Sequence, residues 1–301
     1  MRAVDQPQRE VPETRILRGG ERDRFAQRPG LTPIIEPSRG WRSIRFRELW
    51  EYRELLYFLV WRDVKVRYKQ TLVGVLWTVI QPIALVILFT FIFGRLARLP
   101  SDGIPYPLFF YAAYLPWQLF SRALADSANS LVTNQQLITK IFFPRLLIPV
   151  APVIAGLVDF GISFVVLVGF IFYYGIVPSA AILLLPLFIL LAVVTACGAG
   201  ILLSALNVQY RDVEYTLPFL TQLWFFVTPI AYATTLLPES WRIVYGANPM
   251  AGVVEGFRWT LLGTENGFEP MMAVSACVAA VLLGAGATYF RRVERSFADL
   301  V

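Results

Sequence analysis

The chain contains 301 residues, of which 56% are hydrophobic, 15% aromatic and only 16% charged. Soluble domains carry about 25% charged residues, and several stretches here run for about 20 residues almost without charge, so a soluble enzyme is excluded. The net charge of +6 is unevenly spread, because 16 of the 27 Lys and Arg residues lie before residue 70. These features predict an all-α polytopic membrane protein with a basic N-terminal part.

The N-terminal segment, residues 1–40, is polar, rich in arginine and interrupted by proline. It has no apolar run of the kind that a secretory signal needs. Acidic residues lie between the arginines and no aromatic platform accompanies them, which argues against nucleic-acid binding. We therefore expect residues 1–40 to form a disordered cytoplasmic arm.

Residues 41–70 carry apolar and charged side chains in a pattern typical of an amphipathic helix at the membrane interface. We expect the apolar stripe to sink into the headgroup boundary while the basic face meets anionic lipid. Packing on a soluble partner is the alternative, and the two are compatible because the helix has two faces. The predicted stripe comprises Leu49, Leu55, Leu56, Leu59 and Val60.

Six apolar segments follow that are long enough to cross a hydrocarbon core of about 30 Å at about 1.5 Å per residue. Pro82 lies inside the first segment and is expected to kink it. Arg122 and Asp126 stand four residues apart in the second and are expected to pair on one helical face. The six predicted spans are residues 72–94, 108–132, 146–174, 176–206, 216–236 and 270–290.

Residues 237–269 are too polar to span a membrane as a lipid-facing helix, and we expect short re-entrant or interfacial helices there, outside the cytoplasm and between spans five and six. The positive-inside rule places both termini in the cytoplasm. This predicts a transmembrane domain at residues 71–290 and a cytoplasmic tail at 291–301. Of the 27 Lys and Arg residues, those on the opposite side are only Arg95, Arg98, Arg242 and Arg258.

The chain offers little for chemistry. It has no histidine, and Cys197 and Cys277 fall inside apolar runs, where we expect free packing thiols. Hydrolytic triads and His-ligated metals are therefore excluded. A P-loop needs a lysine that directly follows a glycine, and Lys65, Lys69 and Lys140 do not. We expect no catalytic residue, metal or cofactor in this chain, and any energy from ATP must come through a separate subunit.

Asp159 is the only acid placed for ion coupling inside a predicted span. The alternative is a structural role in which its carboxylate pairs with a neighbouring hydroxyl or amide group. The sequence leaves both interpretations open.

Aromatic side chains gather in spans one, two and five. They are typical of the belts that Trp and Tyr form at membrane interfaces, and of a core. A second interpretation is a conduit, in which aromatic faces let the apolar C–H faces of sugar rings slide past. The residues singled out for the conduit are Phe89, Phe93, Tyr111, Tyr114, Trp117, Trp224, Phe225 and Tyr232.

Three separated motifs carry a family resemblance. They are LLYFLVWRDVKVRYKQTLVGVLWTVIQP at residues 55–82, NQQLITKIFFPRLLIPV at 134–150 and LNVQYRDVEYTLPFLTQLWFFVTPIAY at 206–232. Because these three motifs occur in this order, the chain resembles the ABC-2 type permeases of polysaccharide export. The resemblance is strongest to the transmembrane subunit for O-antigen and lipopolysaccharide. The resemblance covers about residues 41–295.

The resemblance implies a homodimer of six-span subunits in the bacterial inner membrane. Two copies of a separate ATPase, which would bind ATP and Mg, would drive a lipid-linked polysaccharide outward. Residues 238–263 would form re-entrant helices that cap the conduit, and membrane lipids would surround it. The interface helix would meet the ATPase through Trp61, Arg62, Asp63, Lys65, Arg67 and Tyr68. Residues 134–145 would form the coupling helix, which docks into the cleft of the ATPase. Its residues there would be Asn134, Gln135, Gln136, Lys140, Ile141, Phe142, Phe143 and Arg145.

Other functions stay open at this point. Within transport, the cargo could be teichoic acid or another lipid-linked glycan. From a different class, an intramembrane enzyme acting on a lipid-linked sugar would need paired carboxylates or a metal site. The nearest acidic pair, Asp212 and Glu214, lies beside Arg211 and is more typical of a solvated turn. A passive channel would leave the coupling motifs without a purpose.

Overall fold

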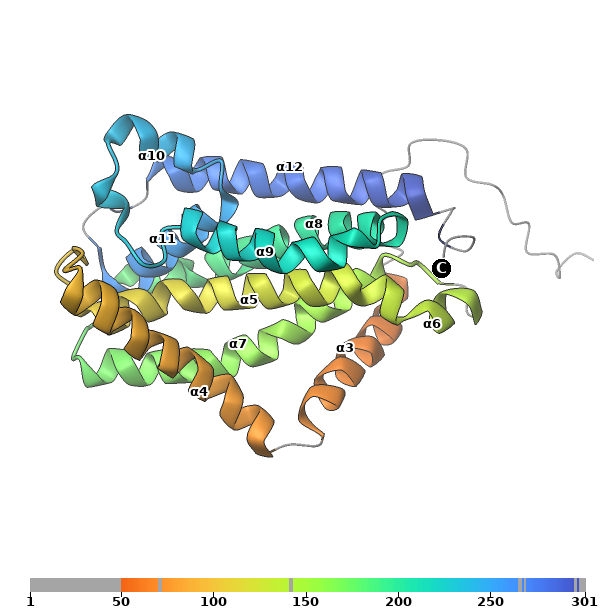
Figure 1. Ribbon diagram of the computed structural model, residues 1–301, viewed down its shortest axis with the longest axis horizontal. Coiled ribbons are helices and arrows are strands. Elements are labelled where there is room, and N and C mark those ends of the chain that lie inside the picture. The colour runs from red at the N-terminus through yellow and green to blue at the C-terminus, as the bar shows by residue number, and fades with distance from the viewer. Residues whose placement is uncertain are drawn as a thin grey trace, which may run out of the picture. The chain divides into compact units, whose positions relative to one another are not determined.

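The computed structural model in Figure 1 describes residues 50–69, 72–140, 143–264, 267, 269–294 and 297. All regular secondary structure in these residues is helical, which confirms the predicted all-α class. The predicted arm and the first part of the predicted interface helix, residues 41–49, lie outside the described residues. The α-helices are α3 (Arg53–Tyr68), α4 (Leu72–Phe89), α5 (Tyr106–Thr133), α6 (Gln135–Lys140), α7 (Leu147–Tyr173), α8 (Leu185–Gln209), α9 (Asp212–Val227), α10 (Glu239–Tyr245), α11 (Pro249–Leu262) and α12 (Pro270–Val293).

Shorter helical turns extend or connect these elements. The helical path of α4 continues through Pro82 and then becomes a π-helix at Thr90–Leu96. A 3-10 turn at Ala180–Leu184 leads into α8, and another at Thr234–Leu236 follows α9.

Within the described residues, four helical stretches are long and apolar enough to cross a membrane, and they coincide with predicted spans one, three, four and six. The chain is therefore a multi-pass membrane protein. The two other predicted spans correspond to α5, which has 28 residues and carries charged side chains, and to α9, which has only 16. The four stretches are Leu76–Leu96, Leu147–Tyr173, Ala180–Gln209 and Pro270–Val293.

The helix of the fifth predicted span ends earlier than expected, at Val227 rather than at residue 236. Thr228 has an extended backbone, with φ −83° and ψ 137°, and Pro229 follows it. A residue before proline is pushed out of the α-helical region by a clash with the proline ring. The local sequence therefore stops α9 at Thr228, and the chain continues toward α10 without a long helix.

Helix α5 lies at the centre of the packing. It contacts α7, α8, α11, α9 and α4, and Figure 1 shows α7 on one side of it and α8 and α9 on the other. Twenty of its residues are buried, including Phe109, Phe110 and Phe120. Such all-round burial lets α5 carry polar side chains, because neighbouring helices rather than lipid surround them.

Buried apolar side chains form two separate clusters. The first core lies along α5 and joins it to α7, α8 and α11. The second core joins segments that are distant in sequence, namely α3, the end of α5, α6, the beginning of α7, and the ends of α8 and α12. Its buried members are Leu59, Leu131, Ile138, Phe143, Leu147, Ile148, Ala151, Ile201, Ala205, Val208, Phe290, Val293 and Phe297.

Two glycines allow α8 and α12 to approach closely. A Cβ atom added at Gly286 would lie 2.5 Å from the carbonyl oxygen of Gly198, and one added at Gly198 would lie 2.7 Å from the backbone nitrogen of Leu283. Both contacts are with backbone, which cannot rotate away as a side chain can. Small residues at such crossings let membrane helices gain close packing contacts.

We expect Gly286→Val to destabilise the protein by about 1–3 kcal/mol or more, because the new side chain would force α12 away from α8. Gly284→Val is the matched control, since a Cβ atom at Gly284 meets nothing within 4 Å. Thermal unfolding of the two purified variants in detergent measures the difference. Equal melting temperatures would show that the crossing tolerates separation.

Candidate functional site

Helix α3 packs its apolar stripe against the protein itself. Leu59 is buried in the second core, and Leu55, Leu56 and Val60 pack beside it. The expectation that this stripe sinks into the headgroup boundary is therefore wrong, because the second core needs it as a wall. Leu49 lies outside the described residues. The exposed face carries Tyr57, Phe58, Trp61, Lys65 and Val66 instead.

The middle of α3 is tied to the start of the predicted coupling helix. Arg62 donates from Nη1 to the side-chain oxygen of Asn134 at 2.8 Å. It also forms an ion pair with its neighbour Asp63, with 2.8 Å between Nη2 and Oδ1. Asn134 is the residue between α5 and α6 and donates to the Ser130 carbonyl oxygen at 2.7 Å. Arg62 therefore fixes α3 to the turn from which α6 begins.

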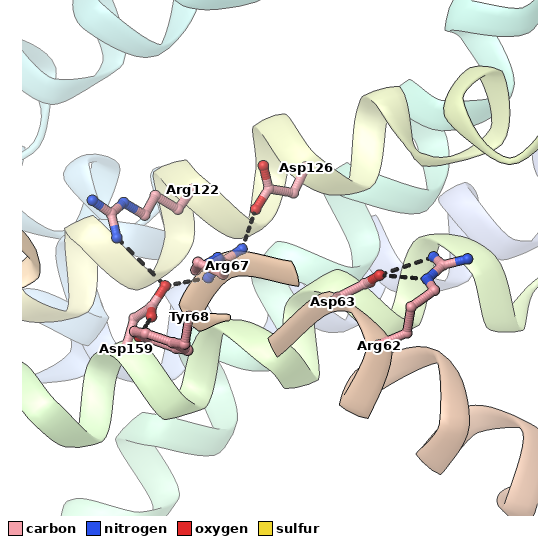
Figure 2. A network of polar contacts seen from close by, with 7 residues as sticks. All are labelled: Arg62, Asp63, Arg67, Tyr68, Arg122, Asp126 and Asp159. Carbon is pink, nitrogen blue, oxygen red and sulfur yellow. Dashed lines mark hydrogen bonds and ion pairs between the residues drawn. The ribbon is translucent and has the colours of Figure 1, made fainter. Parts of the chain in front are cut away.

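The end of α3 lies in a cluster of charged side chains between α5 and α7, shown in Figure 2. Arg67 forms ion pairs with Asp126 of α5, at 2.8 Å, and with Asp159 of α7. The Tyr68 hydroxyl donates to the other oxygen of Asp159. We call Arg67, Tyr68, Arg122, Asp126 and Asp159 the aspartate–arginine cluster.

Arg122 extends this cluster to a fourth helix. It lies 3.4 Å from Asp159 in an ion pair and donates to the side-chain oxygen of Gln81, in α4, at 3.2 Å. The expected pairing of Arg122 with Asp126 is therefore wrong, because each binds a partner from another helix. Burial explains the choice: the Asp159 side chain is only 7% exposed and the Asp126 side chain 46%.

Asp159 has the structural role that the sequence left open. Two guanidinium groups and one hydroxyl, from Arg67, Arg122 and Tyr68, surround its carboxylate. A buried carboxylate without such partners would be strongly disfavoured. With its charge balanced within the protein, Asp159 is a poor candidate for binding a coupling ion.

The predicted coupling segment has an exposed face and a buried face. Gln136 and Lys140 of α6 are exposed, whereas Gln135 is partly buried and Ile138 belongs to the second core. Phe143, which the resemblance assigns to the coupling helix, is buried in this chain's own second core. Ile141 and Phe142 lie outside the described residues.

Sequence analysis missed the part that the end of α12 plays here. Arg145 donates to the Glu294 carbonyl oxygen at 2.6 Å. Phe290 and Phe297 are fully buried in the second core with their ring centroids 5.2 Å apart. Residues predicted as a tail thus contribute to the packing under the coupling segment, and Phe297 was the apolar signal that could have shown it.

Five of the predicted conduit aromatics meet where α4, α5 and α9 face one another, and we call them the aromatic seam: Phe89, Phe93, Trp117, Trp224 and Phe225. Phe89 stacks on Phe93 at 5.3 Å and meets Phe225 edge-on at 5.7 Å. Trp117 meets Phe225 and Trp224 at 5.8 and 6.4 Å. Trp117 is only 4% exposed, whereas the other four are partly buried.

The remaining conduit candidates lie differently. Tyr114 is linked to the seam through Phe110, at 5.6 Å. Tyr111 is fully buried and donates to the Ser163 carbonyl oxygen of α7, away from α9. Tyr232 follows α9 and lies 2.5 Å from the hydroxyl of Tyr245 in α10. The structure therefore does not bring Tyr111 and Tyr232 into the seam.

Similarity to known proteins identifies the family of this chain. The family model described as ABC-2 type transporter matches residues 54–262. The chain belongs to this family. It is 31% identical over 259 residues to the O-antigen export system permease protein RfbA of Myxococcus xanthus, covering 85% of this chain and 98% of the relative.

Two further relatives extend the comparison. A permease protein of the same name from Klebsiella pneumoniae is 32% identical over 251 residues, which is 82% of this chain and 95% of the relative. The polysialic acid transport protein KpsM of Escherichia coli is 24% identical over 201 residues, or 64% of this chain and 76% of the relative.

The features that an intramembrane enzyme would need can be compared with the described residues. No group of three or more His, Cys, Asp and Glu side chains in them could hold a metal ion. Asp212 and Glu214, the acidic pair noted above, lie in the first turn of α9, where carboxylates stabilise the helix N-terminus. Cys197 and Cys277 are free thiols, as expected.

A buried arginine that sequence analysis did not single out organises the opposite end of the ABC-2 fold. Arg258 of α11 is 1% exposed, donates to the carbonyl oxygens of Ile230 and Tyr232, and lies 3.6 Å over the Phe109 ring. It also pairs with Glu255 at 3.6 Å. Arg258 thus joins α11, the segment after α9, and α5.

We expect Arg258→Met to cost about 3–5 kcal/mol, because it leaves Glu255 charged, buried and unpaired. Adding Glu255→Gln should recover part of that loss, since the unpaired charge is then removed. Arg95→Met, at an exposed position, is the control. Thermal unfolding in detergent compares the three variants with the parent protein. An Arg258→Met protein as stable as the control would contradict the structural role of this arginine.

Proposed function

We propose that this chain is the transmembrane subunit of an ATP-driven ABC transporter that exports a lipid-linked polysaccharide, such as O-antigen, across the bacterial inner membrane. The observation that carries this proposal is its identity of about 31% to O-antigen export permeases along almost their whole length. The transporter would be a homodimer of this chain with two copies of a separate ATPase. That ATPase would bind ATP and Mg, for which this chain has no P-loop.

We propose six membrane spans, with both termini in the cytoplasm. Four helices meet the length and composition of a span. The 28 residues of α5 reach about 42 Å at about 1.5 Å per residue, longer than a hydrocarbon core of about 30 Å. The 16 residues of α9 fall short of that thickness, and the segment that follows would complete the crossing. Helices α10 and α11 would then be the re-entrant pair on the outer side.

The ATPase would dock on the exposed face of α6 and on the neighbouring part of α3. Gln136 and Lys140 are available for hydrogen bonds there, and Ile138 and Phe143 anchor the segment from behind. A segment held in this way transmits a push from closing ATPases instead of deforming. The exposed aromatic side chains of α3 fit the membrane interface.

The aromatic seam is the proposed wall of the glycan conduit, with the partly buried rings of α4 and α9 as the surface that sugars would contact. Aromatic faces suit this task because they attract apolar C–H faces without fixing hydrogen bonds. The relatives include both O-antigen permeases and a polysialic acid transport protein, so another glycan, teichoic acid included, is the alternative cargo.

Copurification with the candidate ATPase, followed by reconstitution in lipid vesicles, tests this function. We expect a stable complex whose ATP turnover rises when a lipid-linked O-antigen extract is added, and whose glycan becomes accessible on the far side of the vesicle. A lipid-linked teichoic acid extract distinguishes the alternative cargo. A chain that binds no ABC ATPase and moves no glycan would contradict the proposal.

We also expect Lys140→Glu to weaken binding of the ATPase roughly tenfold, the effect of losing about 1.4 kcal/mol at an interface. Arg95→Glu is the control. It makes the same change of charge in the π-helix that follows α4, and it should leave binding of the ATPase unchanged. Affinity measurement on detergent-solubilised protein compares them. Equal affinities would place the docking surface elsewhere.

A further inference from the structure

Helix α4 is held by few contacts with the rest of the chain. In the candidate span Leu76–Leu96, only 17% of the residues in the most apolar part are buried. The corresponding share is 28–33% in the other three candidate spans. From Leu76 to the end of α4, the buried side chains are Thr78, Pro82 and Val86, which form one narrow stripe spaced by four residues. The position of α4 therefore depends on the few contacts that hold it.

The aspartate–arginine cluster contacts the middle of α4 and holds the helix that precedes α4. Helix α4 starts at Leu72, shortly after α3 ends at Tyr68, and Figure 1 shows the two helices meeting at an angle. Arg67 and Tyr68 hold this end of α3 on Asp159, as Figure 2 shows. Arg122, bound to the same carboxylate, reaches α4 itself through Gln81. One aspartate thus controls the approach of both α3 and α4 to α7.

The contacts of the cluster differ in strength. Asp159 is buried, so removing a donor leaves a carboxylate that water cannot reach, which is costly. Asp126 is half exposed, and ion pairs of that kind contribute little to stability. Two arginines face two aspartates, so the described cluster is balanced in charge without an added ion. Asp159 is therefore the principal point of attachment.

The far end of α4 carries one wall of the aromatic seam. Phe89 lies 4.5 Å from Phe110 of α5 and 5.7 Å from Phe225 of α9, measured between ring centroids. A change in the angle at which α4 leaves α3 would be largest at this distant end. The width of the seam therefore follows from how firmly α3 is held.

We infer that Asp159 is a positioning residue that sets the width of the aromatic seam, by holding the end of α3 and so the angle of α4. This inference rests on the proposed function in that it makes the seam the export conduit. Movement of the coupling segment reaches α3 through Arg62 and Leu59. The aspartate–arginine cluster would then transmit this movement from α3 to α4. In this way the coupling segment would move a helix that is not its neighbour in sequence.

Site-directed labelling tests the inference directly. Phe89→Cys is introduced into the full transporter complex after Cys197 and Cys277 have been replaced by serine. We expect Asp159→Asn to speed maleimide labelling of position 89 roughly tenfold, the change expected when the closed position loses about 1.4 kcal/mol. Asp126→Asn should have a smaller effect, and Val66→Ala, at a side chain of α3 that is 74% exposed, should have none.

Transport gives a second, independent readout. With Asp159→Asn we expect ATP turnover to continue while glycan exported per ATP falls, because the conduit no longer follows the coupling segment. Arg67→Gln, at a side chain that is 28% exposed, serves if Asp159→Asn does not fold. Unchanged labelling and unchanged export per ATP in a folded variant would overturn the inference. A parent complex that exports no glycan would instead overturn the proposed function. The labelling rates would still show whether Asp159 sets the position of α4.

Discussion

The constraint on which this structure depends is the burial of α5. A helix with Arg122, Asp126 and several hydroxyl groups is disfavoured in contact with lipid, so its neighbours must surround it and supply partners. Helix α7 supplies Asp159 and the Pro149 carbonyl oxygen to which Ser127 donates at 2.7 Å. Helix α8 supplies Asn207, which donates to the Ala128 carbonyl oxygen. The other helices pack around α5 because they supply the partners of its polar side chains.

Each end of α5 has its own polar anchor, and the two anchors differ in kind. At one end Arg258 forms an ion pair with Glu255 and donates to backbone carbonyl oxygens. Backbone atoms cannot rotate away as a side chain can. Toward the other end, Arg67 and Arg122 bind carboxylates, which are side chains able to exchange partners. Rigid attachment at one end and exchangeable attachment near the other suit the proposed action of an ATPase at the α6 end.

Hydropathy predicted much of the fold, because a continuous apolar run of about 20 residues has few alternatives to a membrane helix. The bounds of α7 and α12 therefore came within a few residues of those expected. The end of α9 was missed, although Pro229 was a readable local signal. The class of the protein, an ABC-2 permease, followed from motifs rather than from periodicity.

The polar contacts of the site could not be predicted in the same way. Spacing along one helix suggested Arg122 with Asp126, but the choice of partner depends on which carboxylate is buried, and burial follows from packing between helices. The stripe containing Leu59 likewise looked suited to lipid, since a sequence does not distinguish a face covered by lipid from one covered by protein. Phe297, far from α3 in the chain, belongs to the same second core for that reason.

The division of the interior into two cores has a consequence for how the protein comes apart. Cooperative, all-or-none unfolding requires that the loss of one region destabilise every other. Here the second core includes α3, α6 and the end of α12, which contribute no buried residue to the first core along α5. Heating should therefore release the segments around the second core in a separate, earlier transition, and the helices packed along α5 would persist as an intermediate.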